Sequence, residues 1–96
     1  MNQSMLNKLK KMQKEMEEAQ LRLSSKEYFG KASGVTVIMQ GTRQVLDVEI
    51  NPEMIEDLEL VQDAILLAVN DALNQIEKDH EETMSQFTGG MGGFGF

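Results

Sequence analysis

In this 96-residue chain, Glu77 and His80 have the residue types and the spacing that metal binding would need. They form an E-x-x-H pair, and a dimer would supply two copies, as carboxylate-bridged metal centres require. Such centres also need further glutamates that face an apolar bundle core, whereas this pair lies in a polar segment, EKDHEETMSQ. We therefore interpret the pair as part of a solvated helix end, and we expect no metal site.

Two further patterns suggest catalysis or cofactor binding and fail on context. Residues 90–95, GMGGFG, match G-x-G-x-x-G, but a dinucleotide fingerprint follows a strand and opens a helix, whereas this segment follows a predicted helix. Asp47 and Glu49 alternate along a predicted strand, where outward-facing acids are ordinary. His80 is the only histidine and has no recognisable Ser or Cys partner. We expect no enzyme activity, no cofactor and no small-molecule substrate.

Composition limits the class of protein. There is no cysteine, which excludes disulfides and thiolate metal sites and suits a reducing interior. No signal-peptide h-region and no run of ~20 apolar residues occurs, so we expect a cytoplasmic protein without a membrane partner. The length allows one domain, predicted at residues 1–88, followed by a flexible glycine-rich tail at 89–96.

The centre of the chain has the period-2 pattern of a sheet. Val35–Gln40 and Leu46–Ile50 alternate apolar and polar side chains as a hairpin, and Lys26–Ala32 is consistent with a preceding strand. Ser33 and Gly34 supply the first turn, and Gly41 offers the positive φ that the second reversal needs. These segments predict a three-stranded antiparallel sheet, whose free edge invites pairing with a second subunit.

Long helices are predicted on both sides of this sheet, which gives an α+β fold. The first runs from Gln3 to about Ser24, and the second from Leu60 to about Phe87 with an alanine-rich stripe suited to packing on the sheet. The first helix has apolar residues spaced 4, 3, 4, 3 and 4 apart, namely Met5, Leu9, Met12, Met16, Ala19 and Leu23. This seam has two interpretations, packing on the chain's own second helix or on a copy of itself, and we favour both in a dimer.

Charge is unevenly distributed although the total is −7. Residues 1–43 sum to +4 and residues 44–96 to −11. Such asymmetry is typical of an interaction surface, although a solvated face explains most charge runs. Eight basic residues lie in the first part: Lys8, Lys10, Lys11, Lys14, Arg22, Lys26, Lys31 and Arg43.

The order of these elements resembles the YbaB/EbfC family of bacterial nucleoid-associated DNA-binding proteins. The resemblance covers essentially the whole chain, from the Met- and Lys-rich first helix MLNKLKKMQKEMEEAQ onward. Its most specific parts are the G-V-x-V hairpin, the V-x-I-x-P junction at Val48, Ile50 and Pro52, and A-x-N-D-A at Ala68–Ala72.

This resemblance implies a homodimer that joins through its strands and projects helical arms. It implies low-specificity binding of double-stranded DNA at the nucleoid, with effects on chromosome organisation and gene expression, and no catalysis. We expect the lysines of the first helix to be the principal DNA-binding charges and the other four basic residues to be weaker ones. The dimer interface is predicted at Val35, Val37, Met39, Val48 and Ile50. The alternative is a protein-interaction adaptor that holds a partner in the groove between the arms.

Overall fold

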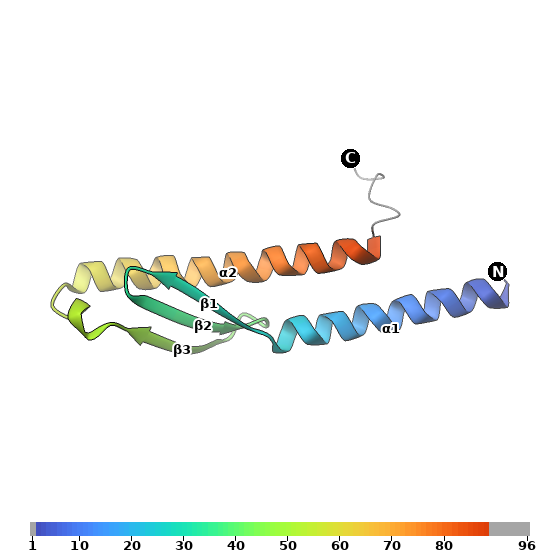
Figure 1. The fold of residues 1–96 in the computed structure, drawn as a ribbon, viewed down its shortest axis with the longest axis horizontal. Coiled ribbons are helices and arrows are strands. Elements are labelled where there is room, and N and C mark those ends of the chain that lie inside the picture. The colour runs from blue at the N-terminus through green and yellow to red at the C-terminus, as the bar shows by residue number, and fades with distance from the viewer. Residues whose placement is uncertain (1, 89–96) are drawn as a thin grey trace.

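The chain folds as two long helices joined by a three-stranded antiparallel sheet (Figure 1). The structure is a computed structural model that describes residues 2–88, so the predicted tail at 89–96 lies outside the described residues. The elements are α1 (Gln3–Ser25), β1 (Glu27–Ala32), β2 (Val35–Gln40), β3 (Val45–Ile50), the short 3-10 helix η1 (Pro52–Met54) and α2 (Leu58–Thr88). The predicted α+β order of elements is confirmed.

The core lies between α2 and one face of the sheet. Strand order is β1-β2-β3, and alternate side chains of the central strand point at the helix. Small residues allow a close approach, since a Cβ on Gly30 of β1 would lie 2.0 Å from the carbonyl oxygen of Ala68 on α2. The buried cluster consists of Tyr28, Val35, Val37, Met39, Ala64, Ala68, Ala72 and Ile76.

Three residues predicted at the dimer interface belong to this core. Val35, Val37 and Met39 are only 1%, 0% and 2% exposed. Alternation along a strand shows which side chains share a face, but it does not show whether a helix or a second subunit covers that face. Here α2 covers it, which leaves Val48 and Ile50, at 42% and 38% exposed, as the accessible members of the predicted set.

Strand β3 lies at the edge of the sheet, and all six of its residues are exposed. Its register with β2 shifts between Ile38 and Met39, so that Asp47 lies opposite Ile38 and Val45 lies opposite Met39. Leu46 is the extra residue of this bulge. Val45 therefore shares the core-side face with Val48 and Ile50, and we name these three residues the β3 face.

The turn at Gly41 differs from the prediction. The positive φ in the β2–β3 connection occurs at Arg43, with φ of 72°, and not at Gly41. Gly41 instead passes close to the end of α1, where a Cβ would lie 1.7 Å from the Leu23 carbonyl oxygen. Space, and not backbone conformation, requires glycine there. The predicted turn at Ser33 and Gly34 is confirmed, with φ of 41° and 84°.

Helix α1 leaves the sheet and extends beyond the end of α2 (Figure 1). The Asn2 side chain caps it by accepting a hydrogen bond of 2.7 Å from the Met5 N–H. Lys26, directly after α1, contacts Asp79 of α2. From this contact, α1 extends away from the sheet over 23 residues and α2 over about nine. The overhang is therefore about 14 residues, or ~21 Å at 1.5 Å per residue. Of the described helices, neither is long and apolar enough to cross a membrane.

Candidate nucleic-acid interface

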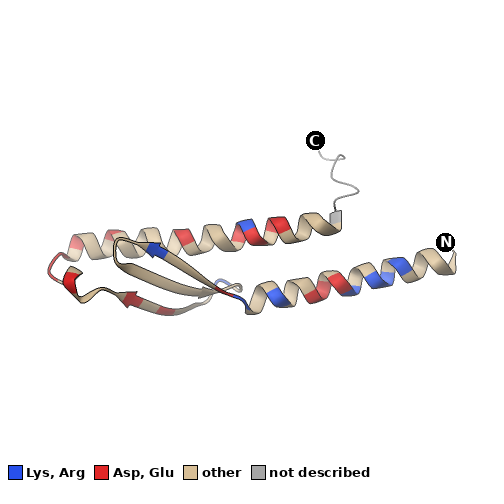
Figure 2. Cartoon of the chain, in the orientation of Figure 1, with Lys and Arg blue, Asp and Glu red and all other residues tan. Residues whose placement is uncertain are grey.

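Four exposed lysines occupy the overhanging half of α1, where Figure 2 shows a cluster of blue segments. A helix turns 100° per residue, so Lys10, Lys11 and Lys14 fall within about one third of the helix circumference. That arc lies opposite the apolar seam that contains Leu9 and Met12. We name Lys10, Lys11 and Lys14 the basic face. Lys8 lies beside the seam instead.

The other four basic residues are exposed but lie apart from this face. Arg22 is in the last turn of α1, Lys31 is on β1, and Arg43 is in the β2–β3 connection. Lys26 follows α1 and forms an ion pair of 2.8 Å with Asp79. Because Lys26 already forms this ion pair, we expect it to bind a phosphate less strongly than the lysines of α1 do. The structure therefore brings only the α1 lysines together.

A three-residue cluster fixes the point where α1 leaves the sheet. The Tyr28 hydroxyl donates to Asp79 Oδ2 at 2.7 Å, and Lys26 Nζ donates to the same oxygen at 2.8 Å. Burial, together with the hydrogen bond to Asp79 and its negative charge, raises the pKa of Tyr28 to about 12. The hydrogen bonds from Lys26 and Tyr28 lower the pKa of Asp79. This cluster joins both helices to β1.

Asp79 ends a polar stripe on α2 that borders the outer edge of β1. The Asp71 carboxylate accepts a hydrogen bond of 3.0 Å from the backbone N–H of Lys31, and Gln75 Nε2 donates one of 2.9 Å to the backbone carbonyl of Phe29. The side chains of α2 thus bond to backbone groups of edge strand β1. The sequence reasoning missed this role, although the i, i+4, i+8 spacing of Asp71, Gln75 and Asp79 beside the alanine stripe was a visible signal.

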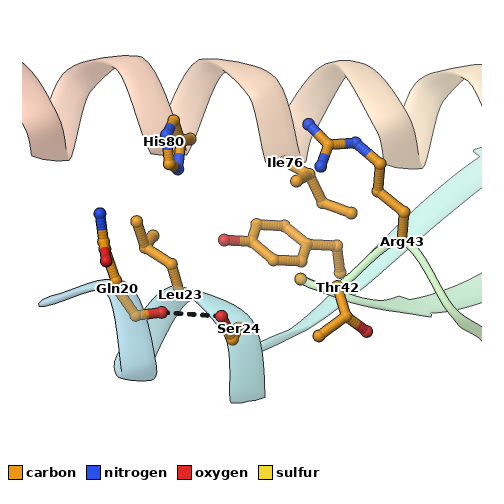
Figure 3. A pocket seen from close by; sticks show the side chains of 9 residues that line it. Gln20, Leu23, Ser24, Thr42, Arg43, Ile76 and His80 are labelled. Atoms are coloured by element: carbon orange, nitrogen blue, oxygen red, sulfur yellow. Dashed lines mark hydrogen bonds between the residues drawn. The ribbon is translucent and has the colours of Figure 1, made fainter. Parts of the chain in front are cut away.

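A hollow of about 310 Å³ lies where α1, the β2–β3 connection and α2 meet. Figure 3 shows the Arg43 side chain extending toward α2, across from Gln20 and Leu23 of α1. Ser24 Oγ donates to the Gln20 carbonyl at 2.9 Å, so that hydroxyl is used within the helix. Arg43 thus lies near the base of the two arms.

Acidic residues dominate α2 and the loop before it (Figure 2). Glu77 and His80, considered above as metal ligands, are both exposed on α2. Within residues 2–88, no group of three or more His, Cys, Asp or Glu side chains is arranged to hold a metal ion. Helix α1 has five basic and three acidic residues, whereas α2 has one basic and seven acidic residues, so the two helices carry opposite net charge.

Comparison with known proteins agrees with this architecture. The model of the YbaB/EbfC DNA-binding family matches residues 1–91. A nucleoid-associated protein from Enterococcus faecalis is 43% identical over 96 residues, with 96% of this chain and 92% of the relative covered. One from Metamycoplasma arthritidis is 40% identical over 86 residues, covering 88% of this chain and 90% of the relative.

A solved structure shows the same fold. The crystal structure of an uncharacterized protein from Helicobacter pylori superposes with a TM-score of 0.71 at 24% identity, covering 90% of this chain and 96% of that one. The fold, the charge distribution and these matches lead to one conclusion: the chain belongs to the YbaB/EbfC DNA-binding family.

Proposed function

We propose that this protein binds duplex DNA at the nucleoid as a homodimer, through phosphate contacts from the α1 arms. The observation that carries the proposal is the basic face of a family member, in which Lys10, Lys11 and Lys14 project together from an exposed helix. Further positive charge for DNA binding comes from Lys8 and, more weakly, from Arg22, Lys26, Lys31 and Arg43. Binding of this kind organises the chromosome and affects gene expression without a catalytic step.

Low sequence specificity follows from the residue types. Lysine is a flexible point charge that meets phosphate oxygens, which are the same at every base pair. The chain as a whole has a net charge of −7, so electrostatic attraction to DNA comes mainly from the α1 arms. The acidic α2 repels the duplex and favours an approach from the basic face.

Two features support a dimer joined at β3. Backbone groups of Phe29 and Lys31 on edge strand β1 already bond to side chains of α2, whereas all six residues of β3 are exposed at the other edge. An exposed edge strand is a template for pairing with another strand. The β3 face adds apolar surface, since Val45, Val48 and Ile50 are 45%, 42% and 38% exposed in one chain. In this proposal the dimer holds the helical arms of both subunits at a fixed spacing.

Duplex binding is tested by titration at several salt concentrations with variants of the basic face. Each phosphate contact contributes about 0.9 to the slope of log K against log salt. Lys11→Gln and Lys14→Gln are each expected to reduce the slope by about 0.9 and to weaken binding similarly for different sequences. Lys78→Gln on α2 makes the same charge change and serves as the control. No binding at low salt, or a salt-independent affinity, contradicts the proposal.

The dimer is tested by a charge at an exposed position of β3. Val48→Glu is expected to give monomers that keep their helix content, because this side chain is 42% exposed in one chain. Val37→Glu is the contrasting variant and should unfold the chain, since Val37 is 0% exposed. Light scattering gives the mass, and circular dichroism gives the fold. A folded Val48→Glu protein that remains a dimer contradicts joining at β3.

The adaptor alternative predicts a different result from lysate. Proteins captured by the wild-type chain should disappear after nuclease treatment if DNA holds them. Capture that persists after nuclease and is lost in a seam variant such as Leu9→Glu would favour the adaptor over DNA binding.

A further inference from the structure

The overhang of α1 leaves an apolar seam uncovered. Ala19, near the base of α1, is 0% exposed, but Met5, Leu9 and Met12 farther out are 54%, 47% and 43% exposed. Met16, between these two parts, is half-buried. Three large side chains in a row on one helix face are therefore open in the single chain. They lie opposite the basic face, so DNA bound there would not cover them.

The spacing of the seam specifies what kind of surface fits it. Written as a heptad abcdefg, Leu9 and Met16 take position a, and Met5 and Met12 take position d. Such a seam packs against a second helix of the same pattern, knobs into holes. If a second copy of α1 runs antiparallel, Leu9 faces Met12 and Met5 faces Met16 of that copy, and both contacts occur twice by symmetry.

Charged residues beside the seam favour one relative direction of the two paired helices. The two g positions of this stretch are Lys8 and Glu15, which have opposite sign. In an antiparallel pair the g sides lie together, so Lys8 of each helix meets Glu15 of the other. In a parallel pair these residues would meet the e positions Gln13 and Gln20, which are uncharged. The antiparallel arrangement thus gains two ion pairs that the parallel one lacks.

We propose that the free part of α1 forms an antiparallel coiled coil with α1 of a second molecule, through the Met5, Leu9, Met12 and Met16 seam. Four layers make a weak contact, and two arms on each dimer strengthen it by multivalency. The pairing leaves Lys10, Lys11 and Lys14 outward on both helices. Combined with the DNA binding proposed above, paired arms present two basic faces on opposite sides and bridge two duplexes.

Cysteine cross-linking without DNA tests the pairing and its direction, because the natural chain has no cysteine. In the antiparallel pair, residue 5 lies beside residue 16 of the second copy, while like positions are 11 residues apart, or about 16 Å. A disulfide needs Cα atoms within roughly 7 Å. A mixture of Met5→Cys and Met16→Cys chains is therefore expected to cross-link, and neither alone should. Cross-linking of Met5→Cys with itself, or none in the mixture, overturns the proposal.

A charge exchange provides the second test, again without DNA. Lys8→Glu and Glu15→Lys each place like charges together twice, and each is expected to weaken assembly beyond the dimer by about tenfold. The double variant, and an equal mixture of the two single variants, should restore it. Asn7→Glu and Asn7→Lys make charge changes on the opposite side of α1 and serve as controls. Light scattering over a range of concentrations measures the assembly.

Other occupants of the seam give different outcomes. If the chain's own residues 89–96 cover it, the full chain will not assemble beyond the dimer whereas a chain that ends at residue 88 will, and that result contradicts pairing between copies of the full chain. If the single charge variants assemble like the natural chain, or if the double variant fails to recover, the proposal is overturned. Because these measurements contain no DNA, they stand or fall separately from duplex binding.

Discussion

Replacing Asp79 with alanine is expected to destabilise the fold mainly through Tyr28. The Tyr28 side chain is 5% exposed, and its hydroxyl donates to Asp79 at 2.7 Å. A buried hydroxyl without a partner costs ~1–3 kcal/mol. The Lys26 side chain is 56% exposed, so its ion pair with Asp79 adds at most ~1 kcal/mol. We therefore expect Asp79→Ala to cost about 2–3 kcal/mol, against at most ~1 kcal/mol for Lys26→Gln.

Urea unfolding measures these costs, with every variant at the same protein concentration because the proposed dimer would make stability depend on concentration. In a Tyr28→Phe background, which lacks the hydroxyl, Asp79→Ala should cost less than about 1 kcal/mol. If Asp79→Ala costs the same with and without the hydroxyl, the cluster does not stabilise the fold in this way.

The ionisation of Tyr28 gives an independent measurement. It is the only tyrosine and the chain has no tryptophan, so the ultraviolet absorbance of tyrosinate reports on this residue alone. Asp79→Ala should lower the pKa of Tyr28 from about 12 toward the ordinary value of 10.0, with the part due to burial remaining. An unchanged titration would contradict the role of Asp79.

Four further predictions concern the pH dependence of this cluster and two other positions of the fold. Because the raised pKa of Tyr28 favours its neutral form, its contribution to stability is complete below about pH 10 and declines toward about pH 12, a decline that Tyr28→Phe should lack in urea unfolding. The lowered pKa of Asp79 has the opposite sign, so its contribution is present above pH 3.8 and falls in more acidic solution, and Asp79→Asn should flatten that part of the profile. Gly30→Ala should cost about 3 kcal/mol or more, measured by the urea midpoint, because the added Cβ meets backbone of α2; an unchanged midpoint contradicts the close packing. Arg43→Gly should raise the melting temperature through relief of ~1 kcal/mol at the positive φ of 72°, and a lower melting temperature contradicts that reasoning.

Periodicity made the elements of this fold predictable. The period-2 alternation of Val35–Gln40 and the long helical segments are local properties, and the structure places a strand and helices there. The bulge at Leu46 was not predicted, because an extra residue in one strand is defined only by its pairing with the other. The prediction for Gly41 was wrong because its role also depends on a distant segment: the atom that excludes a side chain there belongs to α1.

The candidate site was predictable only in part. The clustering of the α1 lysines follows from helical spacing, and the structure leaves them exposed. The ion pair of Lys26 with Asp79 joins residues 53 apart in sequence, which no local pattern reveals. The buried positions of Val35, Val37 and Met39 likewise depend on which strands α2 covers.

The extended shape of the chain affects how its mass can be measured. The radius of gyration is 19.0 Å and the principal extents are 68 × 28 × 12 Å. A compact chain of this length would have a radius of gyration near ~12 Å. A single chain will therefore diffuse slowly and leave a gel-filtration column early, at the position of a considerably larger globular standard. Elution volume alone would make a monomer resemble a dimer, so only methods independent of shape can count the subunits.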